Sequence, residues 1–416
     1  MQSIPRDDTF DVSLALLKDG YRFISRRCAH HNTDAFRTRI MLRPVTCVMG
    51  EDAARMFYEP GRFTRKMSMP PMTLMSLQDV GSVMTLDGAA HEHRKKMFMS
   101  LMGPDSLGEI VSIFERNWRD RLSVWEQQPG ITLHHEVEEL LCRTVCEWAG
   151  IALQDVEVRD RTRELSAMIA GAGAVGPRNW KGLALRARTE HWARDLVDQV
   201  RAVPSSTGPE RPIEILARHR EPNGELLSTK TAAIELLNLL RPTLAVARFV
   251  TFIALALHRH PDYRDKLLQD EARWLEPFVQ EVRRFYPFFP LIAGNATEAF
   301  DWRGEHFSKG SWVVLDIYGT NHDPRIWDQP TRFQPERFEQ WDQSPYNFLP
   351  QGGGEFFSGH RCAGEWMTVE LMKSATRLLT KGMSYEVVPQ DLSIDMSRMP
   401  AVPQSRFIIS QIKRTD

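Results

Sequence analysis

The chain has 416 residues, of which 42% are hydrophobic and 26% are charged, so it has ample material for a large core and is not disordered. Lys and Arg total 53 against 54 Asp and Glu, and a formal net charge of -1 argues against nucleic acid or an anionic membrane as a partner. The cysteines are few, odd in number and far apart, which argues against a disulfide scaffold and favours a reducing, cytosolic setting; they are Cys28, Cys47, Cys142, Cys146 and Cys362.

Apolar residues at three- and four-residue intervals predict helices along most of the chain. The predicted helices span residues 11–27, 105–127, 137–148, 178–203, 228–260, 271–286 and 365–381. The helix over 228–260 is the longest, on the order of 50 Å, and its apolar content predicts a course through the interior. Pro242 lies near its middle and predicts a kink, because proline lacks an N–H and its ring clashes with the preceding turn.

Strand signals are sparse and fall at residues 39–48, 312–316 and 406–412. Residues 202–212 predict a surface loop, and Ser308 to Gly310 predict a hairpin turn. Residues 1–11 lack the apolar stretch of a secretory signal, and no apolar run predicts a membrane anchor. Without repeats or a clear linker, the sequence predicts a mainly α fold with small β-sheets, in a single domain over residues 1–416.

The most informative segment is a glycine-rich loop that brings a cysteine to the start of a predicted helix. Its glycines lie within residues 351–354 and 359–364, and Cys362 precedes the helix over 365–381. Free backbone N–H groups and the helix dipole stabilise a thiolate at such a position, and closely spaced glycines let a flat cofactor approach the backbone. Such a thiolate is a good iron ligand, and a haem thiolate favours O–O cleavage. From these residues alone, a buried and inert cysteine after a turn is the alternative.

Two further motifs favour the iron-ligand interpretation. Glu281 and Arg284 lie three apart, on one face of a predicted helix, and the run Pro-Glu-Arg-Phe follows at 335–338. With the cysteine loop, these motifs resemble those of a cytochrome P-450. Glu281 and Arg284 match its Glu-x-x-Arg pair, Arg337 the third member of that structural cluster, and Cys362 the proximal ligand. The resemblance implies the cytochrome P-450 fold, with haem b between the long central helix and the cysteine loop.

More narrowly, the chain resembles the bacterial fatty-acid peroxygenase branch of this family, over segments 81–102, 237–248, 278–289, 316–338 and 348–373. This branch includes fatty-acid alpha- and beta-hydroxylases and olefin-forming decarboxylases. Glu355 replaces the aromatic residue that usually lies seven positions before the cysteine, and the branch carries the same longer loop. The resemblance implies hydrogen peroxide-dependent hydroxylation of long-chain fatty acids at the alpha or beta carbon. Decarboxylation to terminal alkenes is implied as a side reaction, and no redox partner is obligatory.

The long helix carries Arg241 and Pro242 where typical P-450 monooxygenases place an acid followed by threonine. Arg241 is cationic at working pH and cannot relay a proton, but it can bind a carboxylate bidentately. We hypothesise that Arg241 holds the substrate's carboxylate near the iron, where the helix opens at Pro242. That carboxylate then supplies the missing acid–base function in peroxide cleavage. The alternative for Arg241 is pairing with a neighbouring acid or snorkelling to the surface.

The resemblance also implies roles for residues around the haem and the acyl chain. Arg65, His91, Lys95 and His360 match the propionate-binding positions, and Tyr286 is a further candidate, although each could be an ordinary solvated side chain. Phe288 and Leu291 match the lining of an apolar tunnel, although both could simply be core residues.

Met84 matches a position over the distal haem face that is often Gln or His in this branch. Because a thioether is only a weak acceptor, Met84 favours hydroxylation over olefin formation, although it could equally steer the chain by shape. The runs His91-Glu92-His93 and His134-His135-Glu136 lack convergent partners and predict structural roles rather than metal binding. Cys142 and Cys146 lie four apart and predict core positions.

Two other functions remain open. The first is a redox-partner-dependent P-450 monooxygenase, against which the Arg241-Pro242 pair counts. The second is a non-catalytic haem sensor or fatty-acid binding protein, which would keep Cys362 but would need no carboxylate clamp above the iron.

Overall fold

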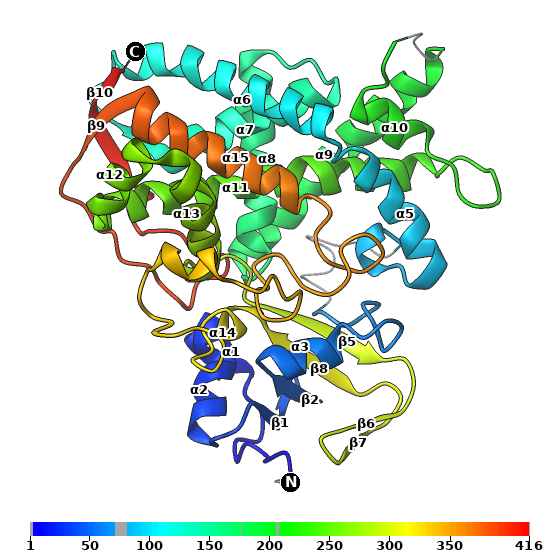
Figure 1. Cartoon of the computed structure of the whole chain (residues 1–416). Helices are drawn as coiled ribbons and strands as arrows, with labels where there is room; N and C mark the ends of the chain where they lie inside the picture. Colours follow the sequence, from blue (N-terminus) through cyan, green and yellow to red (C-terminus); the bar gives the residue numbers. More distant parts are fainter. Residues whose placement is uncertain (1–2, 71–80, 175, 205–207, 416) are drawn as a thin grey trace. The chain divides into compact units, whose positions relative to one another are not determined.

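The computed structural model describes residues 3–70, 81–174, 176–204 and 208–415, so residues 205–207 of the predicted surface loop lie outside the described part of the chain. The chain divides into two compact units, each assembled from separate stretches (Figure 1). The first unit contains residues 1–95, 283–362 and 396–401, and the second contains 96–282, 363–395 and 402–416. A single domain over residues 1–416 stays a prediction.

The first unit is built around a five-stranded sheet with the strand order β1-β2-β8-β5-β3. In this sheet β2 and β8 are parallel, whereas the other neighbours are antiparallel. The strands of this unit, including the separate hairpin β6-β7, are β1 Ala35–Ile40, β2 Arg43–Val48, β3 Phe63–Thr64, β5 Leu291–Ala296, β6 Phe300–Trp302, β7 Glu305–Phe307 and β8 Trp312–Asp316. Its helices and 3-10 turns are α1 Ser13–Asp19, η1 Gly20–Arg22, α2 Phe23–His30, α3 Glu51–Phe57, η3 Val83–Thr85, α14 Ile317–Thr320 and η4 Pro335–Glu339.

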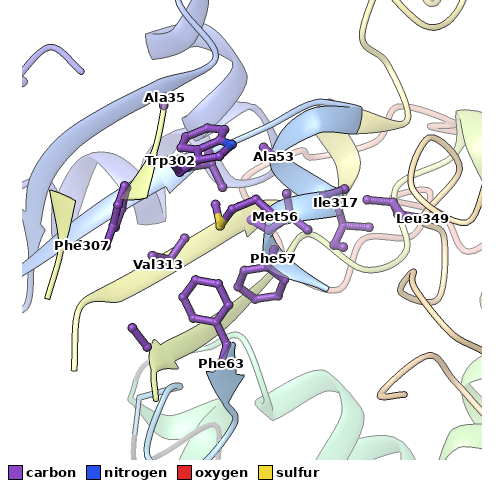
Figure 2. Close-up of a cluster of buried hydrophobic side chains, with 14 residues drawn as sticks. Ala35, Ala53, Met56, Phe57, Phe63, Trp302, Phe307, Val313, Ile317 and Leu349 are labelled. Carbon is purple, nitrogen blue, oxygen red and sulfur yellow. The ribbon is translucent and has the colours of Figure 1, made fainter. Parts of the chain in front are cut away.

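Strand β8 confirms the strand predicted over residues 312–316, and its packing explains why that run is apolar throughout. Val313 belongs to a buried cluster on one face, together with Phe57 (Figure 2). Leu315 belongs to the same cluster. Trp312 and Val314 belong to a second buried cluster. Because successive side chains of a strand point to opposite faces, both faces of β8 are covered, and every position favours an apolar residue.

Two predictions for the strands and turns of the first unit are wrong. Residues 39–48 do not form one strand, because the chain turns at Met41 and Leu42, with φ of 52° and 62°, into the antiparallel hairpin β1-β2. Such two-residue turns usually carry Asn or Gly, so Met-Leu gives no signal. Ser308 to Gly310 do form a turn, with Ser311 N–H donating to Ser308 O at 2.9 Å. It is not a hairpin turn, because β7 pairs with β6, whereas β8 pairs with β2 and β5.

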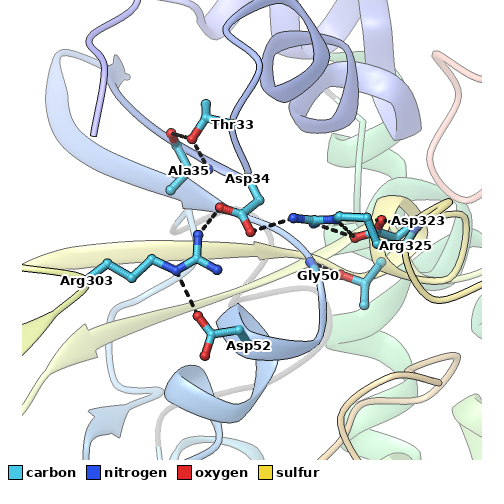
Figure 3. Close-up of polar contacts among 9 residues, drawn as sticks. Thr33, Asp34, Ala35, Gly50, Asp52, Arg303, Asp323 and Arg325 are labelled. Carbon is cyan, nitrogen blue, oxygen red and sulfur yellow. Dashed lines mark hydrogen bonds and ion pairs between the residues drawn. The ribbon is translucent and has the colours of Figure 1, made fainter. Parts of the chain in front are cut away.

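A charge network joins distant segments of the first unit (Figure 3). Asp34 accepts from Arg303 and, at 2.8 Å, from Arg325. Arg303 also contacts Asp52 at 2.8 Å, and Arg325 contacts Asp323 at 2.6 Å. Burial alone would raise the pKa of Asp34, but the two guanidinium groups outweigh it and hold that pKa below its usual range. The network therefore fixes the start of β1 to the chain around residues 303 and 325.

Asp316, the last residue of β8, is expected to make stability depend on pH. Its Oδ1 accepts the Gly319 N–H at 2.6 Å, and its side chain is buried. Burial, opposed by that hydrogen bond, raises the pKa of Asp316 from 3.8 to about 7. The folded chain then binds a proton that the unfolded chain releases, so stability falls as the pH rises between these two values.

The measurement compares thermal unfolding of wild type and Asp316→Asn across this pH range. As the pH rises from about 4 to about 7, we expect the free energy of unfolding of wild type, relative to that of the variant, to fall by up to about 4 kcal/mol. This follows from 1.36 kcal/mol per pKa unit. Asp328→Asn, at an exposed position of the same unit, is the control. A wild-type-to-variant difference that is constant with pH would contradict the expectation.

The second unit is largely helical. Along the whole chain, six of the seven predicted helices are confirmed to within a few residues. The seventh, predicted over 11–27 in the first unit, is instead divided into α1, η1 and α2. The helices of the second unit are α6 Pro104–Trp125, α7 Leu133–Ala149, α8 Asp155–Gly171, α9 Pro177–Ala202, α10 Pro212–Arg218, α11 Thr229–Arg259, α12 Pro261–Gln269, α15 Glu365–Arg377 and the π-helical turn η5 Leu378–Gly382. Helices α5 Gly88–Ser100 and α13 Glu271–Phe285 contain residues of both units. A small sheet has the order β4-β10-β9, with β4 Ile131–Thr132, β9 Met383–Val387 and β10 Ile408–Arg414.

Helix α11 is the longest predicted helix and forms one continuous element. Ser228 caps its start by accepting the Thr231 N–H at 3.1 Å, and the helix packs against α7, α9 and α15. It is long and apolar enough to cross a membrane, but 89% of its most apolar window is buried, which is typical of a core helix. The helix continues through Pro242, so proline does not end it, and the kink stays a prediction.

Candidate active site

Cys362 lies at the end of the glycine-rich loop, three residues before α15. Its N–H donates to Gln351 O at 3.1 Å, and the Gln351 side chain donates from Nε2 to Cys362 Sγ at 3.7 Å. The other four cysteines are buried, whereas Cys362 is partly exposed. Burial raises the pKa of the Cys28 and Cys47 thiols, as expected of inert residues. Cys362 is therefore the cysteine best placed to act as a ligand.

The glycines of this loop are needed by the protein itself. A Cβ at Gly353 would lie 2.4 Å from Leu349 Cδ2 and 2.5 Å from Pro345 O. Gly354 has φ of +77°, and a Cβ there would lie 2.8 Å from Tyr58 Cβ. At these two positions, the absence of a side chain lets the loop pack on its own neighbours.

Lys95 of helix α5 binds the loop just before Cys362. Lys95 Nζ donates to Gly359 O at 2.6 Å and to Arg361 O at 2.5 Å, the two carbonyls that flank His360. One turn earlier on α5, the His91 ring lies against the His360 ring with centroids 4.0 Å apart. The predicted helix face shared by His91 and Lys95 therefore faces the cysteine loop.

Arg65 lies in the same part of the first unit and is buried. Its guanidinium stacks over Phe57 at 4.4 Å, and Nη1 donates to Ala293 O at 2.9 Å. Among the described residues, Arg65 Nε has no hydrogen-bond partner, and burial lowers the pKa of Arg65 although the charges of Tyr58 and Asp87 oppose it. A buried cation with an unsatisfied N–H is costly, so this position fits an anionic group that a ligand would supply.

The positive charge of this cluster comes from Arg65 and Lys95. Burial, followed by Lys95, lowers the pKa of His91 to about 4. Burial, followed by Arg65 and then His91, lowers the pKa of His360 to about 2. At neutral pH both imidazoles are therefore neutral, and each already makes a hydrogen bond to the backbone, His91 to Ser358 and His360 to Leu86. The charges of Arg65 and Lys95 fit the two carboxylates of haem propionates, and the two imidazoles pack beside them.

Arg284 and Arg337 hold the same loop of the first unit. Both donate to Arg332 O, at 3.4 Å and 3.2 Å respectively. Arg284 also donates to the carbonyls of Asn321 and Pro330 at 2.9 Å and 3.0 Å. A structural role for both arginines is consistent with these contacts, and Glu281 lies fully buried one turn earlier on α13.

Arg241, in the second unit, belongs to a hydrogen-bonded chain along α11. Arg241 Nη2 donates to Asn238 Oδ1 at 3.0 Å, and Asn238 Nδ2 donates to Glu235 Oε2 at 3.0 Å. Arg241 is buried, and this burial, followed by the positive charge of Arg186 on α9, lowers the pKa of Arg241 to about 9. The guanidinium is therefore cationic at neutral pH. Two buried arginines within electrostatic range of each other favour binding of an anion.

The other predicted site residues have mixed surroundings. Met84 lies in η3 and is 40% exposed. Phe288 and Leu291 are partly buried, and Phe288 O accepts from Tyr21 at 2.8 Å. Tyr286 is buried, and its ring contacts Phe285 and Phe333 with centroids 5.1 Å and 6.2 Å away.

The two histidine runs and the paired cysteines of α7 have the following surroundings. Over the described ranges, no three His, Cys, Asp or Glu side chains gather as a metal site. His134 contacts Thr251 Oγ1 at 2.9 Å in the core, and Cys142 and Cys146 are buried on α7.

The sequence analysis did not predict the hydrogen-bond partners of Arg241 and Cys362. Asn238 lies three positions before Arg241, so the helical i, i+3 spacing was an available signal. Gln351 lies at the start of the glycine-rich loop, but only the closure of that loop brings its side chain to Cys362.

The comparisons with known proteins agree with this geometry. The Cytochrome P450 family model matches residues 252–398. Among solved structures, a variant of Cytochrome P450SP alpha (CYP152B1) is 43% identical, with a TM-score of 0.94, over 97% of this chain and 99% of that one. Cytochrome P450EX alpha (CYP152N1) with myristic acid is 38% identical, with a TM-score of 0.95, over 100% of both chains. A variant of cytochrome P450 OleT in complex with arachidonic acid is 31% identical, with a TM-score of 0.95, over 100% of this chain and 99% of that one.

Curated relatives match over a shorter region. Cytochrome P450 3A14 of Cavia porcellus is 26% identical over 187 residues, which are 39% of this chain and 36% of that protein. Cytochrome P450 4A11 of Homo sapiens is 26% identical over 217 residues, which are 47% of this chain and 40% of that protein. The chain thus matches less than half the length of these relatives.

Fold and cysteine loop together define a haem-thiolate oxidoreductase, with haem b as its cofactor. The chain belongs to the cytochrome P450 family, in its bacterial fatty-acid peroxygenase branch.

Proposed function

We propose that this protein uses hydrogen peroxide to hydroxylate long-chain fatty acids at the alpha or beta carbon, with decarboxylation to terminal alkenes as a side reaction. The observation that carries the proposal is the buried, cationic Arg241 on α11, fixed by Asn238. It stands where a proton-relaying acid would otherwise be expected. The related structures with myristic acid and arachidonic acid support a long-chain carboxylate as the ligand.

Arg241 binds the substrate carboxylate in this proposal. Its planar fork can donate two parallel hydrogen bonds, which are strong because the guanidinium is charged and shielded from water. A guanidinium that stays protonated cannot pass protons to peroxide, so the bound carboxylate provides the oxygens that accept and return a proton. Pro242 withholds an N–H from the helix at this position. Phe288 and Leu291 contribute apolar surface for the acyl chain.

The cofactor is held by residues of the first unit in this proposal. The Cys362 thiolate would hold the haem iron, and Arg65, His91, Lys95 and His360 would lie against the propionates, with Tyr286 as a further contact. When bound, haem b supplies the iron at which hydrogen peroxide is activated for oxidation of the substrate. Lys95 also fixes the cysteine loop through Gly359 and Arg361, so it serves the ligand as well as the propionates.

One experiment separates this function from its rivals. Hydrogen peroxide is added to purified holoprotein with a long-chain fatty acid and without any reductase. Hydroxylated acid supports the proposal, turnover only with a redox partner supports a conventional monooxygenase, and binding without turnover supports a sensor. We also infer a cytoplasmic setting, because none of the five cysteines forms a disulfide and a reducing compartment keeps cysteines in that state.

Met84→His is expected to shift the products of wild type, mainly hydroxylated acids, towards terminal alkenes. A histidine can exchange protons or hold the substrate, whereas a thioether is only a weak acceptor. We expect the alkene share to rise several-fold, as measured by gas chromatography. Met84→Leu, which keeps an apolar side chain of similar size, should leave the ratio nearly unchanged. Alkene as the main wild-type product would refute this ordering.

A further inference from the structure

Gln351 connects Cys362 to a buried arginine of α13. Arg283 Nη2 donates to Gln351 Oε1 at 3.0 Å, and Gln351 Nε2 donates to Cys362 Sγ at 3.7 Å. The backbone of the same glutamine accepts the Cys362 N–H at 3.1 Å. Arg283 is 2% exposed, and it lies between the two residues of the Glu-x-x-Arg motif that are paired in this family's pattern. All three residues belong to the first unit.

Arg283 determines which end of the Gln351 amide meets the sulfur. A guanidinium can only donate hydrogen bonds, so it takes the amide oxygen of Gln351. The amide NH2 group then faces Cys362. Without Arg283 the amide could rotate and present an oxygen to the thiolate, which would repel it. The contact between Gln351 and the sulfur is thus a property of the pair rather than of the glutamine alone.

We propose that Gln351, oriented by Arg283, is a positioning residue that draws electron density from the Cys362 thiolate and raises the reduction potential of the bound iron. The proposal deepens the proposed function and rests on Cys362 being the axial ligand. A hydrogen bond to a ligating sulfur stabilises its negative charge and weakens its donation to the metal. The positive charge of Arg283, buried and hence little screened, polarises the amide in the same direction.

The test measures the ferric/ferrous midpoint potential of the purified holoenzyme by spectroelectrochemical titration. In Gln351→Leu, which lacks the donor, we expect the reduction equilibrium to fall by roughly threefold to tenfold, where tenfold corresponds to 59 mV for one electron. Gln340→Leu, at an exposed position of the same unit, should leave the potential unchanged. An unchanged potential in Gln351→Leu would overturn the proposal. If that variant does not bind haem, Gln351→Met provides the same test with an unbranched side chain.

A double-mutant comparison tests the part assigned to Arg283. Arg283→Met should lower the potential in the wild-type background and have a clearly smaller effect in the Gln351→Leu background. Equal shifts in both backgrounds would mean that Arg283 acts through its charge alone, which contradicts its role as the orienting partner. Failure of the proposed function is separately visible, because the ferrous–carbon monoxide spectrum of wild type would then lack the thiolate signature.

Discussion

Arg241→Ala is expected to abolish peroxide-driven oxidation of fatty acids while haem binding is retained. The substitution removes the charged fork that would hold the substrate carboxylate, and with it the carboxylate oxygens that would move the proton. The fork donates two charge-assisted hydrogen bonds, each of about 1.5–3 kcal/mol, so together they contribute about 3–6 kcal/mol, and each 1.36 kcal/mol of barrier is a factor of ten. We therefore expect kcat/KM to fall by at least about a hundredfold, measured by product formation with peroxide and a long-chain fatty acid.

Arg248→Ala is the matched control on the same helix. Arg248 is also buried on α11, and its Nη1 lies 3.9 Å from Glu138 Oε1 on α7. Removing Arg248 leaves the buried Glu138 carboxylate with less nearby positive charge. We therefore expect a lower free energy of unfolding with little change in KM. Arg241→Lys keeps the charge but loses the fork and should recover part of the activity. Full activity in Arg241→Ala, or equal turnover of carboxyl-free compounds, would refute the clamp.

The helical part of the fold could be predicted because its signals are local. Helix α11 carries apolar residues over nearly its whole length, and Ser228 marks its start by a side-chain cap. Strand β8 could be predicted because both of its faces are buried, which gives an uninterrupted apolar run. Both elements are buried on all sides, and this burial requires the continuous apolar residues that are visible in the sequence.

The sheet around β8 could not be predicted because its pairing is set by contacts distant in sequence. Strand β5 pairs with β8 but contains Gly294, where a Cβ would lie 2.8 Å from Phe63 Cβ, so close packing replaces strand propensity. The Met41-Leu42 turn carries none of the residues that favour positive φ. Both features depend on the assembled sheet rather than on local preference.

In the site, the residues themselves could be predicted from the sequence, but several of their contacts could not. Family resemblance identified Arg65, His91, Lys95 and His360 one by one, and the structure brings them together in the first unit. It did not indicate that Lys95 also holds the cysteine loop through two backbone carbonyls. Such carbonyl contacts carry no sequence signature, because every residue offers the same acceptor. The hydrogen bond from Gln351 to Cys362 escaped prediction for a related reason, since loop closure creates it.

Cys362→Ala is expected to remove the thiolate signature from the ferrous–carbon monoxide spectrum and to reduce peroxide-driven turnover below detection. Alanine offers no axial ligand, and thiolate donation is what favours O–O cleavage in this class of protein. We expect the loss to exceed a thousandfold, about 4 kcal/mol of barrier. Cys142→Ala is the control, because Cys142 is a buried residue of α7. It should lower stability while keeping the spectrum.

The loop contacts make the cause of this loss identifiable. Lys95 holds Gly359 and Arg361 through their carbonyls, and the residue 362 N–H can still donate to Gln351 O in the variant. The loop should therefore keep its conformation when the sulfur is absent. We expect the circular dichroism spectrum of the Cys362→Ala apoprotein to match that of wild-type apoprotein. If Cys362→Ala retains the thiolate signature, Cys362 is not the ligand. One of the four remaining cysteines would then have to be the ligand.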